Sequence, residues 1–193
     1  TILAELIEKS NYNFKALYDQ RIRDYSGKTL FKVIKGERFI EYTWEQVDKT
    51  VQKYSSSLSS IISNYSAEDM DVAFLLENSL DMALLDIACL STGIRNVMIP
   101  ANSVSAHIVF ILNQSKVPVV IVSNEKQLSK IKGIKSELLF LQEVVLMSGK
   151  SIESWVISLK EFLELKSIKH ENTLGINNLT SLMYTSGTTG DPK

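Results

Sequence analysis

The sequence holds a single cysteine in 193 residues, which excludes a disulfide framework. That residue, Cys89, lies in the apolar run ALLDIACL, where a lone thiol is typically a small core side chain. No apolar run approaches the roughly 18 residues that a membrane helix requires. The N-terminus also lacks a basic stretch followed by an apolar one, as a secretory signal would have. These absences predict a cytoplasmic protein with no integral membrane segment.

An excess of charge of one sign is missing as well. The chain carries 21 Lys and Arg against 22 Asp and Glu, a formal net charge of -1, with no long block of either sign. Proteins that bind nucleic acid usually show a basic footprint, because neutralising phosphate charge supplies much of their affinity. The sequence therefore predicts no nucleic-acid partner. The apolar fraction of 45% is ordinary for a globular protein with a sizeable core.

The first third of the chain predicts helices and one hairpin. Apolar spacings indicate a short helix and then a second helix from residue 2 onward, with an Asn-rich break between them. Residues 29–43 are typical of a β-hairpin that turns at Gly36. Thr43 and Gln46 match a capping box, so a helix should begin there. Its apolar stripe is expected in the core and comprises Trp44, Val47, Val51, Tyr54, Leu58, Ile61 and Ile62.

From Met70 onward, apolar strands alternate with amphipathic helices. Strands are predicted at 71–78, 95–100, 117–123, 141–147 and 178–185, and helices at 79–92, 104–115, 124–134 and 153–165. Strands that are apolar throughout, such as VPVVIVS, suit a sheet covered on both faces. The predicted fold is α/β: a doubly wound, mostly parallel sheet with helices on both faces, preceded by an N-terminal helix and a β-hairpin.

The last predicted strand runs into YTSGTTGDPK, which is the stretch most suited to chemistry. In an open parallel sheet, ligands bind beyond the carboxyl ends of the strands. Its glycines let the backbone approach a ligand closely, and its hydroxyls and amides can hold anionic oxygens beside a lysine. The spacing differs from the Walker pattern G-x-x-x-x-G-K-[ST]. Composition alone would also suit a surface turn. The candidate phosphate-binding residues are Thr185, Ser186, Gly187, Thr188, Thr189, Gly190 and Lys193.

The ordered string Thr-Ser-Gly-Thr-Thr-Gly-Asp-Pro-Lys resembles the phosphate-binding signature of adenylate-forming, or AMP-binding, enzymes. Two further segments, 42–58 and 90–103, resemble the first and second motifs of that superfamily. Residues 107–131 are similar to the segment that follows in long-chain fatty acid CoA ligases and other acyl-CoA synthetases. The resemblance covers most of the chain from about residue 30.

The resemblance implies a ligase that joins a small-molecule carboxylic acid to ATP and then passes the acyl group to coenzyme A, with Mg²⁺ assisting. It implies that the chain is a single, incomplete N-terminal domain over 1–193, inactive alone, with catalytic residues beyond residue 193. Within it, 1–69 holds the helix, hairpin and capped helix, 70–185 the alternating core, and 185–193 the phosphate loop. We also expect exposed sheet edges to favour self-association.

Other functions remain open at this stage. One is adenylation of an amino or aryl acid for a carrier protein, although the string VSNEKQLSKI favours a fatty acid. Others are a non-catalytic nucleotide-binding module and an interaction domain. His107 and His170 have no partners at metal-ligand spacing, so no metal site is predicted. Asp81 and Asp86 are spaced poorly for a paired-carboxylate site, and we expect a structural hydrogen bond at Asp86. Both Trp44 and Trp155 are expected to be packing anchors near helix starts.

Overall fold

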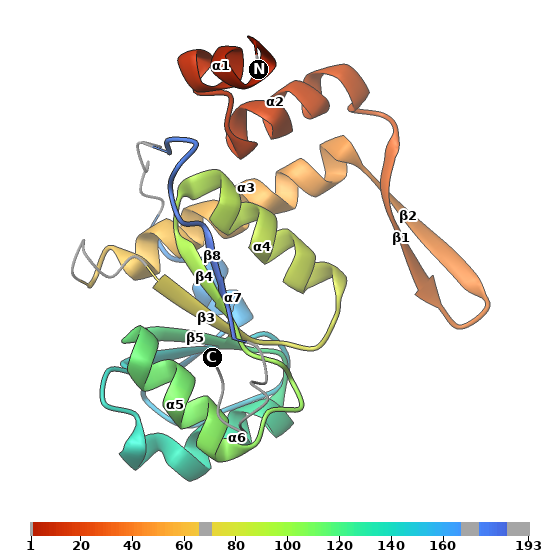
Figure 1. Cartoon of the computed structure of the whole chain (residues 1–193). Coiled ribbons are helices and arrows are strands. Elements are labelled where there is room, and N and C mark those ends of the chain that lie inside the picture. Colours follow the sequence, from red (N-terminus) through yellow and green to blue (C-terminus); the bar gives the residue numbers. More distant parts are fainter. Residues whose placement is uncertain (1, 66–70, 167–173, 185–193) are drawn as a thin grey trace.

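A computed structural model of the chain describes residues 2–65, 71–166 and 174–184 (Figure 1). The helices are α1 (Ile2–Ser10), α2 (Phe14–Tyr25), α3 (Trp44–Ile62), α4 (Leu80–Thr92), α5 (Ser105–Ser115), α6 (Glu125–Ile134) and α7 (Leu159–Leu163), with a short 3-10 turn at Lys135–Glu137. The strands are β1 (Thr29–Lys35), β2 (Arg38–Thr43), β3 (Asp71–Leu75), β4 (Arg95–Met98), β5 (Val119–Val122), β6 (Glu143–Leu146), β7 (Val156–Ser158) and β8 (Ser181–Met183).

The main sheet has six strands in the order β7-β6-β5-β3-β4-β8, and every neighbouring pair is parallel. The chain therefore runs from β3 to β4 on one side, crosses back to β5, β6 and β7 on the other, and returns to β4 as β8. This is the doubly wound topology that the alternating strand and helix pattern predicts.

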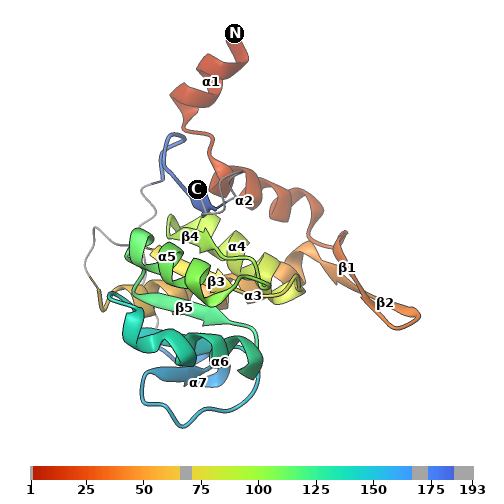
Figure 2. The ribbon, with the colours of Figure 1, turned by 60° about the horizontal axis from the view of Figure 1, so that its bottom comes forward.

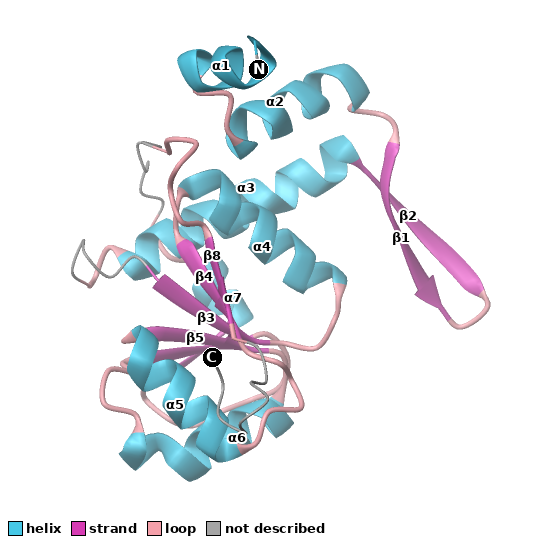
Figure 3. Ribbon diagram, viewed as in Figure 1, coloured by secondary structure: helices cyan, strands magenta, loops and turns pink. Residues whose placement is uncertain are grey.

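Helices cover both faces of this sheet, as Figure 3 shows. On one face α3 and α4 pack together over the strands, with α2 and α7 against them, and on the other face lie α5 and α6. Alternate residues of β3 divide between the two cores: Val72 and Phe74 join the first, and Ala73 and Leu75 the second. Such double burial explains why these strands are apolar throughout. Cys89 is fully buried in the first core, as predicted, and burial raises the pKa of its thiol.

Two N-terminal elements stand away from the sheet. The β1–β2 ribbon projects from the body in Figures 1 and 2, and Ile34 and Phe39 on it are 71% and 66% exposed. The predicted hairpin is confirmed, with Gly36 in the left-handed region at φ 61°. Helix α1 contributes no buried residue, and Figure 2 shows it leading away from α2. The predicted pair of short helices is also confirmed.

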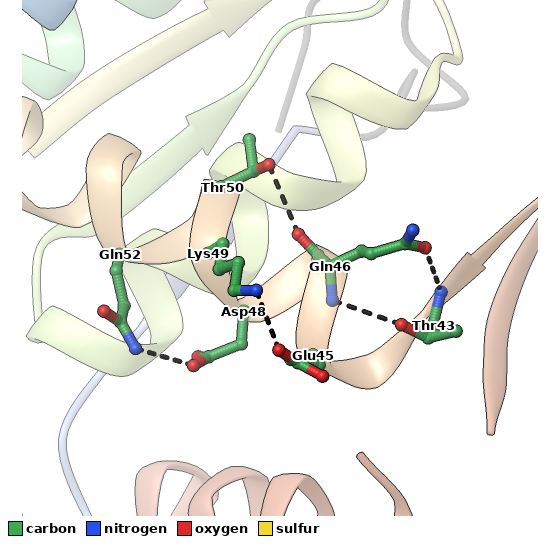
Figure 4. Close-up of polar contacts among 7 residues, drawn as sticks. All are labelled: Thr43, Glu45, Gln46, Asp48, Lys49, Thr50 and Gln52. Carbon is green, nitrogen blue, oxygen red and sulfur yellow. Dashed lines mark hydrogen bonds and ion pairs between the residues drawn. The ribbon is translucent and has the colours of Figure 1, made fainter. Parts of the chain in front are cut away.

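Helix α3 begins where the sequence predicts, at a complete capping box (Figure 4). Thr43 Oγ1 accepts from the Gln46 N–H at 3.3 Å, and Gln46 Oε1 accepts from the Thr43 N–H at 2.9 Å. Two backbone donors that the helix start would leave unpaired are thereby satisfied. Of the seven residues in the predicted apolar stripe, six are buried and Trp44 is partly buried against the same core.

One predicted element is wrong. A single helix was expected over 153–165, but the structure has strand β7 followed by the short helix α7. The β-branched pair Val156 and Ile157 pairs with β6 and extends the sheet by one strand. A second capping box then starts α7: Ser158 Oγ accepts from the Glu161 N–H, and Glu161 Oε2 accepts from the Ser158 N–H at 2.7 Å. The S-x-x-E spacing of that box was visible in the sequence.

Candidate functional site

The carboxyl ends of β3, β4 and β8 meet at one edge of the sheet, because these strands are parallel neighbours. Strand β8 is held on β4 by the pairs Asn96 with Ser181 through Met98 with Met183. Tyr184 follows directly, and the predicted phosphate loop comes after it. Its seven candidate residues, Thr185, Ser186, Gly187, Thr188, Thr189, Gly190 and Lys193, lie outside the described residues, so their contacts stay a prediction.

A cleft of about 650 Å³ opens at this edge. Segments that follow β3 and β4 form two of its walls, and the end of β8 forms the third. The lining residues are Leu76, Glu77, Asn78, Met82, Met98, Ile99, Pro100, Ala101, Asn102, Met183 and Tyr184. Apolar side chains dominate, with backbone and amide groups among them, which is typical of a small-molecule site. Tyr184 is the last described residue before the loop, so the loop begins at the wall of this cleft.

Glu77, at the carboxyl end of β3, carries the charge in this cleft. Its carboxylate accepts hydrogen bonds from Gln127 Nε2 at 2.7 Å, from the Ser123 hydroxyl, and from Asn124 Nδ2 at 3.4 Å. The bonds from Gln127 and Ser123 lower the pKa of Glu77 to about 2. Glu77 is therefore an anion at any physiological pH, and its donors hold it in place.

These donors lie between β3 and β5, at the point where the order of the strands in the sheet reverses. The chain leaves β3 toward the face that carries α4 and leaves β5 toward the face that carries α6. Such a switch point opens a crevice between the two strands. Here the Glu77 network joins the end of β3 to the start of α6, where Asn124 also caps the helix through the Lys126 and Gln127 amides. Polar contacts thus fill the crevice, and the cleft lies beside it, between β3, β4 and β8.

A second polar network attaches β8 to the body of the sheet. Asn96, on β4, is fully buried; its Nδ2 donates to Asp86 Oδ1 at 2.5 Å, and its Oδ1 accepts from the Ser181 hydroxyl at 2.5 Å. The predicted structural hydrogen bond at Asp86 is confirmed. Burial raises the pKa of Asp86, and the bond from Asn96 opposes that rise. Helix α4, strand β4 and the strand that leads to the loop are thereby connected.

The other candidate residues have structural surroundings. Asp81 accepts a hydrogen bond from the Tyr54 hydroxyl at 2.8 Å, so it and Asp86 serve separate contacts. His107 lies in α5, and His170 is outside the described residues. Trp44 packs against Tyr18 with ring centroids 6.0 Å apart, as a packing anchor should.

Trp155 was expected near a helix start, but it precedes strand β7 and its carbonyl accepts from the Val144 N–H. It is partly buried against the second core and is covered by Lys135, 5.7 Å from the ring centroid. The packing role holds, therefore, in a different secondary structure.

A second groove, of about 490 Å³, lies between α2, α3 and the last turn of α4. Tyr18 reaches it with a buried hydroxyl that has no hydrogen-bond partner in the described part of the chain. Burial first, and then the Asp48 carboxylate, raises the pKa of Tyr18. Since α4 starts beside the cleft and ends here, this groove is at the opposite end of the helix from the carboxyl ends of the strands.

Within 2–65, 71–166 and 174–184, no cluster of three or more His, Cys, Asp or Glu side chains could hold a metal ion. No Mg²⁺ ligand is therefore assigned to a described residue. Among the helices of these same ranges, none has both the length and the apolarity needed to cross a bilayer.

Comparisons with known proteins agree on the fold. A family model described as AMP-binding enzyme matches residues 18–193. The anthranilate CoA ligase AuaEII, solved with anthranoyl-AMP, has a TM-score of 0.78 at 21% identity, over 94% of this chain and 34% of that one. A Mycobacterium tuberculosis fatty acyl CoA synthetase gives 0.73 at 20% identity, over 96% and 34%.

A red-emitting luciferase from Phrixothrix hirtus gives a TM-score of 0.71 at 23% identity, over 93% of this chain and 34% of that one. The chain thus spans about a third of the length of these structures. No curated protein sequence matches it.

Proposed function

The chain belongs to the family of AMP-binding enzymes, and from this membership we propose that it forms part of an ATP-dependent acid–thiol ligase, an acyl-CoA synthetase. In the proposed reaction, a carboxylate oxygen attacks the α-phosphorus of ATP, and the bond to the bridging oxygen breaks to release pyrophosphate. The thiol sulfur of coenzyme A, having lost its proton, then attacks the acyl carbonyl carbon and AMP leaves. The products are AMP, pyrophosphate and the acyl thioester.

One observation carries this proposal: Tyr184, which directly precedes the predicted phosphate loop in the sequence, lies on the wall of the cleft at the carboxyl ends of β3, β4 and β8. In parallel sheets this edge is where nucleotides bind. We propose that the hydroxyls and backbone amides of residues 185–190 hold the β- and γ-phosphates, with Lys193 adding a positive charge. Glycines at 187 and 190 would let the loop close over the phosphates and open to release pyrophosphate. Mg²⁺ would assist by neutralising phosphate charge, with ligands outside the described residues.

The proposed acid is a fatty acid. Support comes from the similarity of residues 107–131 to long-chain fatty acid CoA ligases, and from the fatty acyl CoA synthetase among the structures with the same fold. The anthranilate CoA ligase with the same fold makes an aryl acid the first competitor. Both acids share the acceptor, coenzyme A, so acid selection is the step to be measured.

The test is ATP–pyrophosphate exchange by the complete protein that contains this chain, with ATP, Mg²⁺ and a panel of fatty, aryl and amino acids. We expect exchange that depends on the added acid and is fastest with fatty acids. Exchange with no acid of the panel would contradict the proposed ligase activity, and exchange with amino acids alone would contradict the choice of a fatty acid.

The role of the loop is tested by Lys193→Met, with Lys53→Met as the control. A charge pair at about 4 Å is worth about 1 kcal/mol in water and about 4 kcal/mol in a partly shielded site. Lys193→Met should therefore slow exchange by roughly 5-fold to 10³-fold. Lys53 is exposed on α3 and should change exchange less than twofold. Equal rates for the two variants would refute the loop assignment. By calorimetry, the 193-residue chain alone should bind ATP no tighter than about millimolar, since one lysine charge supplies only a few kcal/mol.

A further inference from the structure

The connection between β4 and α5 contains a tight turn that forms one wall of the cleft. Pro100, Ala101 and Asn102 line the cleft directly. A backbone hydrogen bond from the Ser103 N–H to the Pro100 carbonyl, 2.9 Å long, closes the turn. Before it, the Ile99 N–H donates to the Phe74 carbonyl at 2.9 Å, which fixes the start of the connection on β3. Beyond Ile99 the turn has left the sheet, so other groups must hold it.

Two side chains of α6 hold the turn by its carbonyl groups. Lys130 Nζ donates to the Ala101 carbonyl at 2.7 Å and to the Ser103 carbonyl at 3.3 Å. Gln127 Nε2 donates to the same Ala101 carbonyl at 3.1 Å. Residues three apart lie on one face of a helix, so both side chains reach the turn from the same direction. We call Gln127 and Lys130 the α6 clamp.

The base of this clamp, Gln127, is buried and hydrogen-bonded. Gln127 is 2% exposed, and its Nε2 donates to Glu77 Oε1 at 2.7 Å as well as to the turn. Glu77 is itself held by Ser123 and Asn124. Both acceptors of this buried amide lie on its nitrogen and hold it in this orientation, while its Oε1 has no hydrogen-bond partner in the described part of the chain. The turn is thereby tied to the ends of β3 and β5, the two strands at the switch point.

Lys130 has a different character. Its side chain is partly exposed, and its ammonium group donates hydrogen bonds to backbone carbonyls. Within the described ranges it forms no ion pair with a carboxylate. Two carbonyl acceptors that converge on one part-buried ammonium group specify the position of the turn, because the donor can satisfy both only when the turn keeps this shape.

We propose that Gln127 and Lys130 are positioning residues: they fix the Pro100–Ser103 turn as a wall of the cleft against which ATP binds. This inference rests on the proposed function. Neither residue is required to touch a substrate. A loosened wall would have to become ordered when ATP binds. This cost weakens the binding of ATP in the ground state and in the transition state alike, so the KM for ATP should rise while kcat stays unchanged.

The experiment compares Lys130→Met with Lys126→Met, which removes the same charge from the exposed side of the same helix. Hydrogen exchange is measured on the complete protein that contains this chain. In Lys130→Met the Ser103 amide should exchange about tenfold faster, while the Ile99 amide stays within twofold of the parent. Lys126→Met should leave both amides unchanged. Lys130→Arg should restore protection, because a guanidinium group can donate to both carbonyls.

Steady-state kinetics of the complete protein give the second readout. Lys130→Met should raise the KM for ATP about fivefold to tenfold and change kcat less than twofold, with recovery in Lys130→Arg. An unchanged Ser103 amide would overturn the clamp itself. Faster exchange with an unchanged KM, or a fall in kcat alone, would overturn the positioning role. If the parent protein shows no pyrophosphate exchange with any acid of the panel, the proposed function fails, and the positioning role fails with it. The hydrogen exchange of the Ser103 amide still decides whether the clamp exists.

Discussion

Replacing Asn96 by Leu tests how β8, the strand that leads to the predicted phosphate loop, is attached. Asn96 is fully buried and bridges Asp86 on α4 to Ser181 on β8 through two hydrogen bonds of 2.5 Å. Leucine has the same branching and the same number of side-chain heavy atoms, with bulkier methyl groups, but can make neither bond. The substitution therefore removes the bridge without opening a large cavity.

The expected cost at pH 7 follows from the two lost bonds. A hydrogen bond to a charged acceptor contributes about 1.5–3 kcal/mol, and the neutral bond to Ser181 about 1 kcal/mol. Leucine gains some apolar burial in return, so the net loss should be about 2–4 kcal/mol. Because domains are stable by about 5–15 kcal/mol, such a loss is easily measured by urea denaturation.

The pH dependence gives a sharper test. Burial raises the pKa of Asp86 above its unfolded value, and the Asn96 bond opposes this rise. A carboxyl group with a raised folded pKa binds more protons in the folded state, so stability falls as pH increases from about 4 through the folded pKa. Without Asn96 the folded pKa rises further and the fall steepens. The deficit of Asn96→Leu should thus be largest near pH 7 and shrink toward pH 4.

A double-mutant cycle with Asp86→Asn isolates the charge. In that background Asn96→Leu should cost only about 1 kcal/mol, which leaves a coupling energy of about 2 kcal/mol. Amides of β8 should also exchange faster in Asn96→Leu than those of β3. A deficit that is constant from pH 4 to pH 8, or that is the same with and without the Asp86 charge, would refute this account of the bridge.

Two further predictions concern stability. Thr43→Ala breaks the capping box of α3 and should lower the free energy of unfolding by about 1 kcal/mol, whereas Thr43→Ser should retain it and Thr50→Ala, in the same helix, should cost less than about 0.5 kcal/mol. Equal urea midpoints for the two alanine variants would contradict it. Glu77, with its pKa lowered to about 2, stabilises the fold above its unfolded pKa, and this contribution is lost as pH falls from about 4 to 2. Glu77→Gln should flatten the stability curve across that range; urea midpoints that fall in parallel with the parent would argue against it.

Local signals in the sequence predicted much of the fold. The Thr43 capping box and the apolar stripe after it predicted where α3 starts and which face it buries, because both depend on residues three or four apart. The apolar strands predicted a sheet covered on both faces. The helix expected over 153–165 failed because pairing with β6 overrides the helical spacing of Val156 and Ile157.

Contacts between distant segments were harder to predict from the sequence. A hydrogen bond at Asp86 could be predicted from its apolar surroundings, but its partner Asn96 depends on how α4 lies over β4. Gln127 and Lys130 resemble ordinary polar residues of a surface helix. Their contacts with Ala101 bridge 26 and 29 residues, so only the packing of α6 against the turn reveals them.

The position of β8 in the sheet has a consequence for the order of folding. It pairs with β4 across 85 residues of sequence, whereas β3, β4, β5 and β6 pair after shorter connections. The entropy of closing so long a loop is lost before the three pairs of β8 can repay it. We therefore expect the sheet to form first without its β8 edge. The strand that precedes the predicted phosphate loop would pair last, with a sheet that has already formed during synthesis.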